Sequence, residues 1–168
     1  EIILDTVHEP MLILDKFIRI KSANKSFCKT FRFVEDDIIG MSLYKLGGNE
    51  WNIPRLRELL EEIVPRNNYF QDFEVELTLP AIGHKIMLLN AHRIAQQSKK
   101  EELIVLTIID ITKVRHLALE IELKEKELLH KALDESQAAQ ILLEKAVAER
   151  TAELEKQKEF SDTIIDSS

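Results

Sequence analysis

The sequence has few of the residues that form disulfides, metal clusters and turns. Its 168 residues include one cysteine, Cys28, which excludes an intrachain disulfide and a cysteine-rich metal site. Glycine and proline number four each, and all of them lie at or before position 83. The longest largely apolar run covers only the seven residues 103–109, whereas a membrane-spanning helix needs about 20. We therefore expect no membrane contact.

An excess of acidic side chains limits the partners. The chain has 30 Asp and Glu against 23 Lys and Arg, a formal net charge of −7, and a nucleic-acid-binding protein needs a basic face. The apolar fraction of 45% is enough for a hydrophobic core. The sequence opens at Glu1, without methionine or signal peptide. It therefore predicts a soluble, cytoplasmic piece of a longer protein, with no nucleic-acid partner.

Turn-forming and aromatic residues divide the sequence into two parts. Nine of the ten aromatic residues lie at or before Phe73, and only Phe160 comes later. Because aromatic residues build compact cores and glycine and proline mark turns, residues 1–112 predict a globular domain. The remainder predicts uninterrupted secondary structure.

Apolar periodicity in the first part predicts an α+β domain. Asn24 is placed to cap its first helix and Pro65 to end its third. The last strand is apolar on both faces, so we expect it to be central and covered on both sides. These elements predict a five-stranded sheet with helices on one face. The strands are expected at residues 11–15, 18–21, 73–79, 85–94 and 103–112, and the helices at 25–33, 34–40 and 53–63.

Residues 113–160 contain no helix breaker and predict one helix about 72 Å long. Most of it must project from a domain whose radius of gyration is about 13 Å. A lone helix is marginal in water, so its wide apolar stripe predicts a homodimer through a parallel coiled coil. The candidate seam residues are Leu117, Ile121, Leu128, Leu129, Leu133, Leu143, Val147 and Leu154.

Two registers fit this stripe, and the sequence leaves both open. An eleven-residue register favours a straighter or slightly right-handed coil, whereas a heptad register favours a left-handed one. The heptad seam contains Leu129, Leu133, Leu143, Val147 and Leu154, with Ser136, Gln140 and Arg150. The eleven-residue seam, with steps of 4, 4 and 3, contains Leu117, Ile121, Leu128, Ala132, Ala139, Leu143, Val147 and Leu154.

Four landmarks in residues 1–112 together resemble a PAS sensor domain. They are Ile3-Leu-Asp-Thr with Pro10-Met-Leu-Ile-Leu-Asp15, then Ser22-Ala-Asn24-Lys-Ser-Phe, then Ile39-Gly40, and finally Asp110-Ile111-Thr112. The resemblance implies a five-stranded antiparallel sheet in the order 2-1-5-4-3.

The long helix also carries a resemblance. Glu149, Arg150 and Thr151 are similar to the signalling helices between sensor and output modules of bacterial two-component proteins. Sensor histidine kinases and fused chemotaxis methylesterase/methyltransferase proteins contain such helices. At the end of the chain, residues 164–167 resemble residues 3–6. This repeat predicts that residues 161–168 begin a truncated second PAS-like domain.

The resemblance points to the strand-to-helix junction as the place where signals pass. Thr112 is expected to cap the helix start, and Asp110 lies just before the positive helix end. Asp110 can also reach Arg115, one turn further on. These three residues are therefore expected to fix the direction in which the helix leaves the sheet.

No cofactor is expected, although a small ligand could occupy the pocket. Cys28 lies on the first helix, outside the Asn-Cys-Arg-Phe type of motif that forms a flavin adduct in light-sensing relatives, so we expect it to pack in the core. His84 and His92 match no haem-binding helix pattern. Trp51 could stack on a ligand, but more simply it fills the helical side of the domain. No residues have the spacing of a metal site.

The sequence thus predicts a regulatory sensor and dimerisation module, not an enzyme. His116 and His130 lie on the long helix, but neither is followed by the acidic residue and Arg-Thr-Pro of a kinase phosphoacceptor. In this interpretation the helix relays a conformational change to a downstream output domain. Two alternatives stay open: a receptor with a small molecule between sheet and helices, and a passive coiled-coil spacer.

Overall fold

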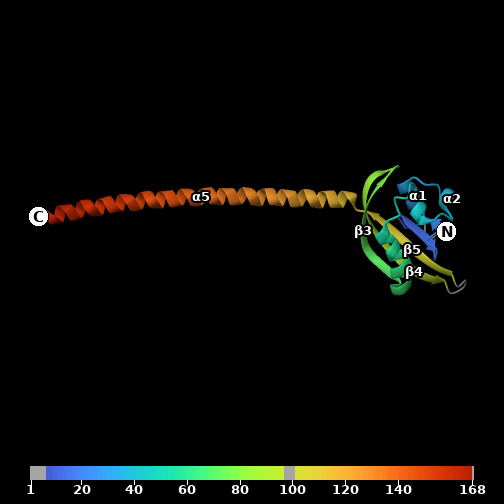
Figure 1. Cartoon of the computed structure of the whole chain (residues 1–168). Coiled ribbons are helices and arrows are strands. Elements are labelled where there is room, and N and C mark those ends of the chain that lie inside the picture. The colour runs from blue at the N-terminus through green and yellow to red at the C-terminus, as the bar shows by residue number, and fades with distance from the viewer. Residues whose placement is uncertain (1–6, 97–100, 168) are drawn as a thin grey trace. The chain divides into compact units, whose positions relative to one another are not determined.

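The computed structural model of the chain describes residues 7–96 and 101–167. The chain divides into two units, one that ends at His116 and a helical one that begins at Leu117. Figure 1 shows the strands gathered in the first unit and helix α5 as one unbroken ribbon. Residues 3–6, on which the predicted repeat depends, lie outside this description.

Five antiparallel strands form one sheet in the order β2-β1-β5-β4-β3 (Figure 1). The predicted fold class and strand order are therefore confirmed. The strands are β1 (Met11–Asp15), β2 (Ile20–Ala23), β3 (Tyr69–Leu79), β4 (Gly83–Gln96) and β5 (Glu101–Asp110).

β5 is the central strand, as predicted, but only one of its faces is fully buried. Ile104, Leu106 and Ile108 point into the core and are at most 5% exposed. Val105 and Ile109 lie on the other face and are only half-buried. The helices of the first unit pack against the inner face. The prediction that both faces are covered is therefore wrong within the described chain.

The core lies between the inner face of the sheet and the helices. Leu12 of β1, Leu89 of β4, Phe27 and Trp51 are completely buried. Phe31 meets Trp51 edge to face, with ring centroids 5.7 Å apart. Trp51 thus fills the helical side of the core, as its simpler interpretation predicted. Each large apolar side chain buried in this way contributes about 1.5–3 kcal/mol.

Asn24 joins the first helix to the first strand. Its side-chain oxygen accepts hydrogen bonds from the N–H groups of Phe27 and Met11, both at 2.9 Å. The predicted helix cap is therefore confirmed, and the same side chain also fixes β1. The short helical segments after β2 are α1 (Lys25–Phe31), α2 (Glu35–Ile38) and η2 (Leu43–Lys45).

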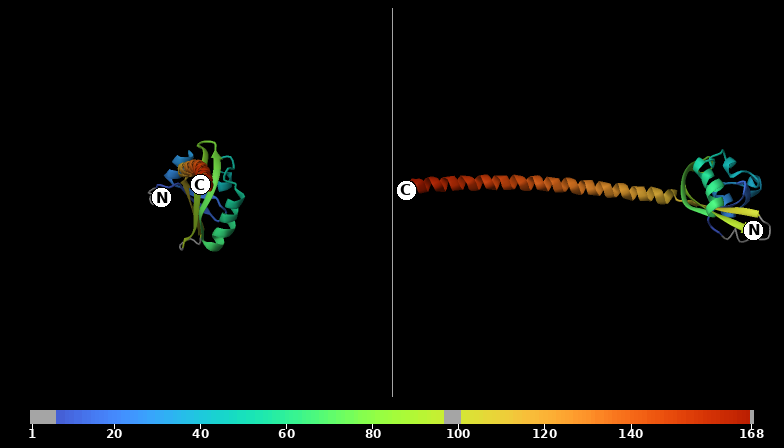
Figure 2. Two further views of the ribbon diagram at one scale, coloured as in Figure 1. Left: turned by 90° about the vertical axis from the view of Figure 1, so that its left-hand side faces the viewer. Right: turned by 60° about the horizontal axis from the view of Figure 1, so that its bottom comes forward.

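Pro65 does not end the third helix, which corrects the prediction. Helix α3 (Pro54–Glu58) continues through a π-helical turn, η3 (Leu59–Ile63), into α4 (Val64–Asn67). Proline has no N–H and clashes with the carbonyl four residues earlier, and the wider π turn relieves that clash. The segment ends at Asn68 in the left-handed region, with φ 69°. Figure 2 shows it lying along the sheet.

β3 begins earlier than predicted because it contains a bulge. The register with β4 shifts between Phe70 and Phe73. Asp72 adopts φ 57° there, and its N–H donates to the Asn90 side chain at 2.7 Å. The extra residue interrupts the alternation of apolar and polar positions. The sequence pattern therefore shows only the regular half of the strand.

Helix α5 spans Thr112–Asp166, 55 residues in all. It is therefore longer than predicted, and its expected end at residue 160 is wrong. Neither proline nor glycine follows position 83, so nothing in the sequence breaks the helix there. The assignment of residues 161–168 to a second domain stays a prediction.

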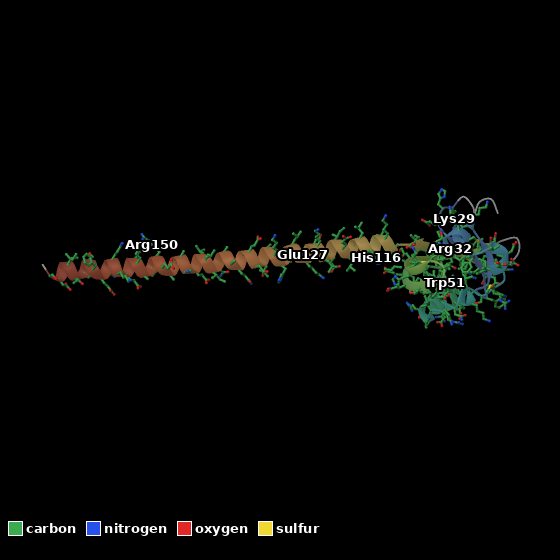
Figure 3. The ribbon with its side chains drawn as sticks, turned by 90° about the horizontal axis from the view of Figure 1, so that it is seen from above. Lys29, Arg32, Trp51, His116, Glu127 and Arg150 are labelled. Atoms are coloured by element: carbon green, nitrogen blue, oxygen red, sulfur yellow. The ribbon has the colours of Figure 1, made fainter. Side chains whose placement is uncertain are left out.

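The surface of α5 is open along its length. Every side chain described from residue 113 to 167 is exposed. Figure 3 shows the side chains standing around the helix, with Glu127 and Arg150 labelled. In the part of the chain that the structure describes, no helix is long and apolar enough to cross a membrane.

Candidate functional site

Asp110, the last residue of β5, holds the start of α5 to the sheet. One carboxylate oxygen accepts a hydrogen bond from Lys85 Nζ at 2.8 Å. The other accepts from the Thr112 N–H at 2.9 Å. Lys85 is available because β4 pairs with β5 so that Met87 lies opposite Asp110. The carboxylate therefore serves both an ion pair and one of the first free N–H groups of the helix.

These contacts change the acidity of Asp110. Partial burial opposes its ionisation, but the hydrogen bonds from Lys85 and Thr112 outweigh burial and hold the pKa of Asp110 below its usual value. Asp110 is therefore a stable anion at neutral pH. Its predicted contact with Arg115 is wrong, because the Arg115 guanidinium pairs with Glu74 of β3 instead.

Thr112 binds β4 and is not the helix cap. Its hydroxyl oxygen accepts a hydrogen bond from the Ile86 N–H at 2.9 Å. The neighbouring Ile111 N–H donates to the Ile86 carbonyl at 2.9 Å. Arg115 N–H donates to the Ile111 carbonyl at 2.8 Å, so Ile111 takes the cap position. The prediction that Thr112 caps the helix is therefore wrong: it is already the first helical residue.

Arg115 reaches the sheet from the first turn of α5. Its Nε donates to Glu74 Oε2 of β3 at 3.0 Å, and a second guanidinium nitrogen contacts the same oxygen. Arg115 is 53% exposed and Glu74 is 38% exposed. Solvent therefore weakens this ion pair, which contributes at most about 1 kcal/mol to stability. The pair nevertheless fixes the direction of the first turn of α5 relative to β3.

All three predicted junction residues thus contact one structural unit, the β3–β4 hairpin. Asp110 binds Lys85, Thr112 binds Ile86, and Arg115 binds Glu74. The structure brings the three together as predicted, but through partners that the sequence did not indicate. A displacement of this hairpin therefore acts directly on the first turn of α5.

Sequence reasoning missed Lys85 and Glu74 because their roles depend on strand register. A signal was available for Lys85, since β4 and β5 are consecutive strands and the register of such a pair decides which residues lie opposite each other. Glu74 lies in the regular half of β3, but local patterns do not show which strand residue the first turn of α5 contacts. Its partner could be found only from the structure.

The depressed pKa of Asp110 predicts a pH-dependent contribution to stability. A carboxyl group whose folded pKa lies below its unfolded value, about 3.9, stabilises the fold fully above that value and loses the effect as pH falls through the folded pKa. Asp110→Asn should therefore lower the melting temperature at pH 7 and lower it less at pH 3. Asp36→Asn, an exposed site on α2, is the control. An equal loss from Asp110→Asn at both pH values would contradict this linkage.

The predicted dimer-seam residues all lie on α5 and all are exposed. Their exposed fractions range from 49% at Leu154 to 72% at Leu129. In the described chain they have no role in the core of the first unit. The full set is Leu117, Ile121, Leu128, Leu129, Leu133, Leu143, Val147 and Leu154.

The signalling-helix residues Glu149, Arg150 and Thr151 also face solvent. Arg150 pairs with Glu153 one turn away at 2.9 Å. The Thr151 hydroxyl donates to the Val147 carbonyl at 2.8 Å. These contacts lie within the helix and leave the motif accessible from outside.

The candidate cofactor residues make ordinary packing and surface contacts. Cys28 packs against the core, as predicted. His84 lies 2.6 Å from the Glu76 carboxylate, and His92 stacks on the ring of Tyr69. Among residues 7–96 and 101–167, no three His, Cys, Asp or Glu side chains come close enough together to hold a metal ion.

Three solved structures of PAS domains are similar to this chain. The PAS domain of BvgS from Bordetella pertussis is similar, with a TM-score of 0.56 and 19% identity over 74% of this chain and 93% of that one. The PAS domain of nitrogen regulation protein NR(II) from Vibrio parahaemolyticus gives 0.54 and 19%, over 66% and 95%. A PAS domain from a two-component sensor histidine kinase gives 0.51 and 9%, over 65% and 90%.

Sequence comparison gives the same assignment. A search of curated proteins found no match. A family model described as PAS domain matches residues 8–113, which is more than half of the chain. The matched segment contains the whole sheet and ends one residue after Thr112. The chain therefore belongs to the PAS domain family.

Proposed function

We propose that this chain is the sensor and dimerisation part of a bacterial, cytoplasmic signal-transduction protein. The PAS domain responds to a signal, and α5 carries the resulting change to an output domain further along the same chain. Output domains of the histidine kinase or chemotaxis methyltransferase type suit such a helix. The role of the chain itself is regulatory, not catalytic.

The observation that carries the proposal is the attachment of α5 to the β3–β4 hairpin. Hydrogen bonds and ion pairs from Asp110, Thr112 and Arg115 all end on this hairpin. The first turn of the helix must therefore follow any shift of β3 and β4. A passive spacer does not need three such contacts in its first turns.

Dimerisation through α5 is the second part of the proposal. A single helix that exposes a row of leucine, isoleucine and valine side chains is marginal in water. Pairing two copies buries that row without any other partner. The similarity to a PAS domain from a two-component sensor histidine kinase supports the same kind of role.

A charge reversal at the junction tests the relay in the complete gene product. Arg115→Glu places two carboxylates together at Glu74, so we expect the signal response of the output activity to be lost. Because the pair is largely exposed, the melting temperature should hardly change. Glu74→Arg combined with Arg115→Glu restores opposite charges and should restore the response.

The control for this experiment is Arg150→Glu, which removes an ion pair within α5 that involves no residue of the sheet. It should leave the junction unaffected. A normal signal response in the Arg115→Glu protein, measured beside an unchanged melting temperature, would show that the junction only anchors the helix.

A further inference from the structure

Helix α5 continues past its predicted end at residue 160. This added length helps to decide between the heptad and the eleven-residue register of the coiled coil. Building on the proposed dimer, we propose that α5 pairs in parallel with a second copy of itself through an eleven-residue seam. This seam extends from Leu117 to Ile165, and its steps of 4, 4 and 3 also pass through Glu125, Arg150 and Lys158. It thus extends past residue 160, where the sequence pattern predicted the helix to end.

A row of side chains eleven residues apart forms the centre of this seam. Eleven residues make about three turns at 3.67 residues per turn, so such positions lie on nearly one line along a helix. None of the row's members is charged, and Ile165 adds a fifth member because α5 continues to Asp166. The row consists of Ile121, Ala132, Leu143, Leu154 and Ile165.

The heptad seam includes a charged residue in each of its two rows of side chains. Continued back from Leu129, it would place Glu122 and Lys126 between the helices. These two side chains form an ion pair with each other at 2.9 Å and are 59% and 70% exposed. Burying such charges costs several kcal/mol each unless they are well paired. The eleven-residue seam leaves this pair on the surface, and its own charged positions, Glu125, Arg150 and Lys158, lie outside the central row.

Charge complementarity favours a parallel arrangement. At 100° per residue, Lys124 lies about 60° to one side of Ile121, and Glu125 lies about 40° to the other side. In a parallel two-fold pair, opposite sides of the two helices meet at the same height. Lys124 of one copy therefore meets Glu125 of the second copy at the start of the seam. An antiparallel pair centred on Leu143 would bring Ile121 opposite Ile165 instead.

Cysteine cross-linking in the full chain separates the two registers. Ile121→Cys and Ile165→Cys lie in the eleven-residue seam, whereas Glu122→Cys and Ile164→Cys lie in the heptad seam. Each is made in a Cys28→Ala background and oxidised at equal concentration. Because a disulfide needs Cβ atoms about 4 Å apart, we expect residues 121 and 165 to link to their own copies at least about tenfold faster than their neighbours.

The other outcomes are distinct. Faster links at positions 122 and 164, or equal rates at all four, would overturn the eleven-residue seam but leave the dimer. Links that form only when the Ile121→Cys and Ile165→Cys proteins are mixed would show an antiparallel pair and overturn the parallel seam. Slow linking at every site, with a monomer in light scattering, would overturn both the seam and the proposed dimer.

Discussion

Leu106→Asp is expected to lower the free energy of unfolding of the PAS domain by about 3–5 kcal/mol, the usual cost of an uncompensated buried charge. Leu106 is completely buried on the central strand. It lies between Leu12 of β1 and Ala91 of β4, both of which are also fully buried. An aspartate there finds neither water nor a cation. At neutral pH much of the domain should therefore be unfolded.

Val105→Asp is the matched control for this prediction. Val105 is adjacent on the same strand but points to the outer face, where it is only half-buried. Its substitution should cost clearly less, because the new carboxylate reaches water. Urea unfolding followed by Trp51 fluorescence measures both variants, since Trp51 is the only tryptophan and lies in the core. Equal losses in the two variants would mean that the outer face is buried as well.

Leu143→Glu combined with Val147→Glu is expected to turn the dimer into a monomer. Both positions belong to the seam in either register, so the substitutions place four like charges between two helices. We expect the dissociation constant to rise at least about a hundredfold, equivalent to about 2.7 kcal/mol. Light scattering at micromolar concentration measures the change in mass.

The control carries the same substitutions on the opposite face of α5. Ala148→Glu with Ala152→Glu has the same spacing of two glutamates four residues apart, so it adds the same pair of like charges to the helix. Neither position belongs to a seam, so this protein should remain a dimer. If the control dissociates as well, net charge and not the seam decides assembly.

The sequence predicted most of the fold because its patterns are local. The strand order follows from the resemblance to the PAS family. The cap at Asn24 follows from one side chain at the start of a helix. Pro65 misled the prediction because a π turn accommodates a proline that would otherwise end the helix. The bulge near Asp72 hid the first half of β3 for a similar reason, since it interrupts the alternation.

The sequence predicted which residues form the candidate site, but not which residues they contact. Asp110, Thr112 and Arg115 are all at the junction, yet each binds a residue of β3 or β4 at least 25 positions away in the sequence. Such pairings depend on strand register, which local patterns do not contain. The half-buried outer face of β5 was missed because apolar residues on both faces do not show whether a second layer covers them.

The unbroken helix has a consequence for any protein built by joining this domain to a different output. Each residue added to or removed from α5 turns everything beyond that point by about 100° and shifts it by about 1.5 Å. Inserting one residue therefore rotates the output domain by about 100° around the helix axis, whereas inserting eleven residues returns it to within about 20° of its original direction. Joined proteins should keep their regulation at spacings that preserve the phase of the helix. At intermediate spacings the same signal could switch the output in the opposite sense.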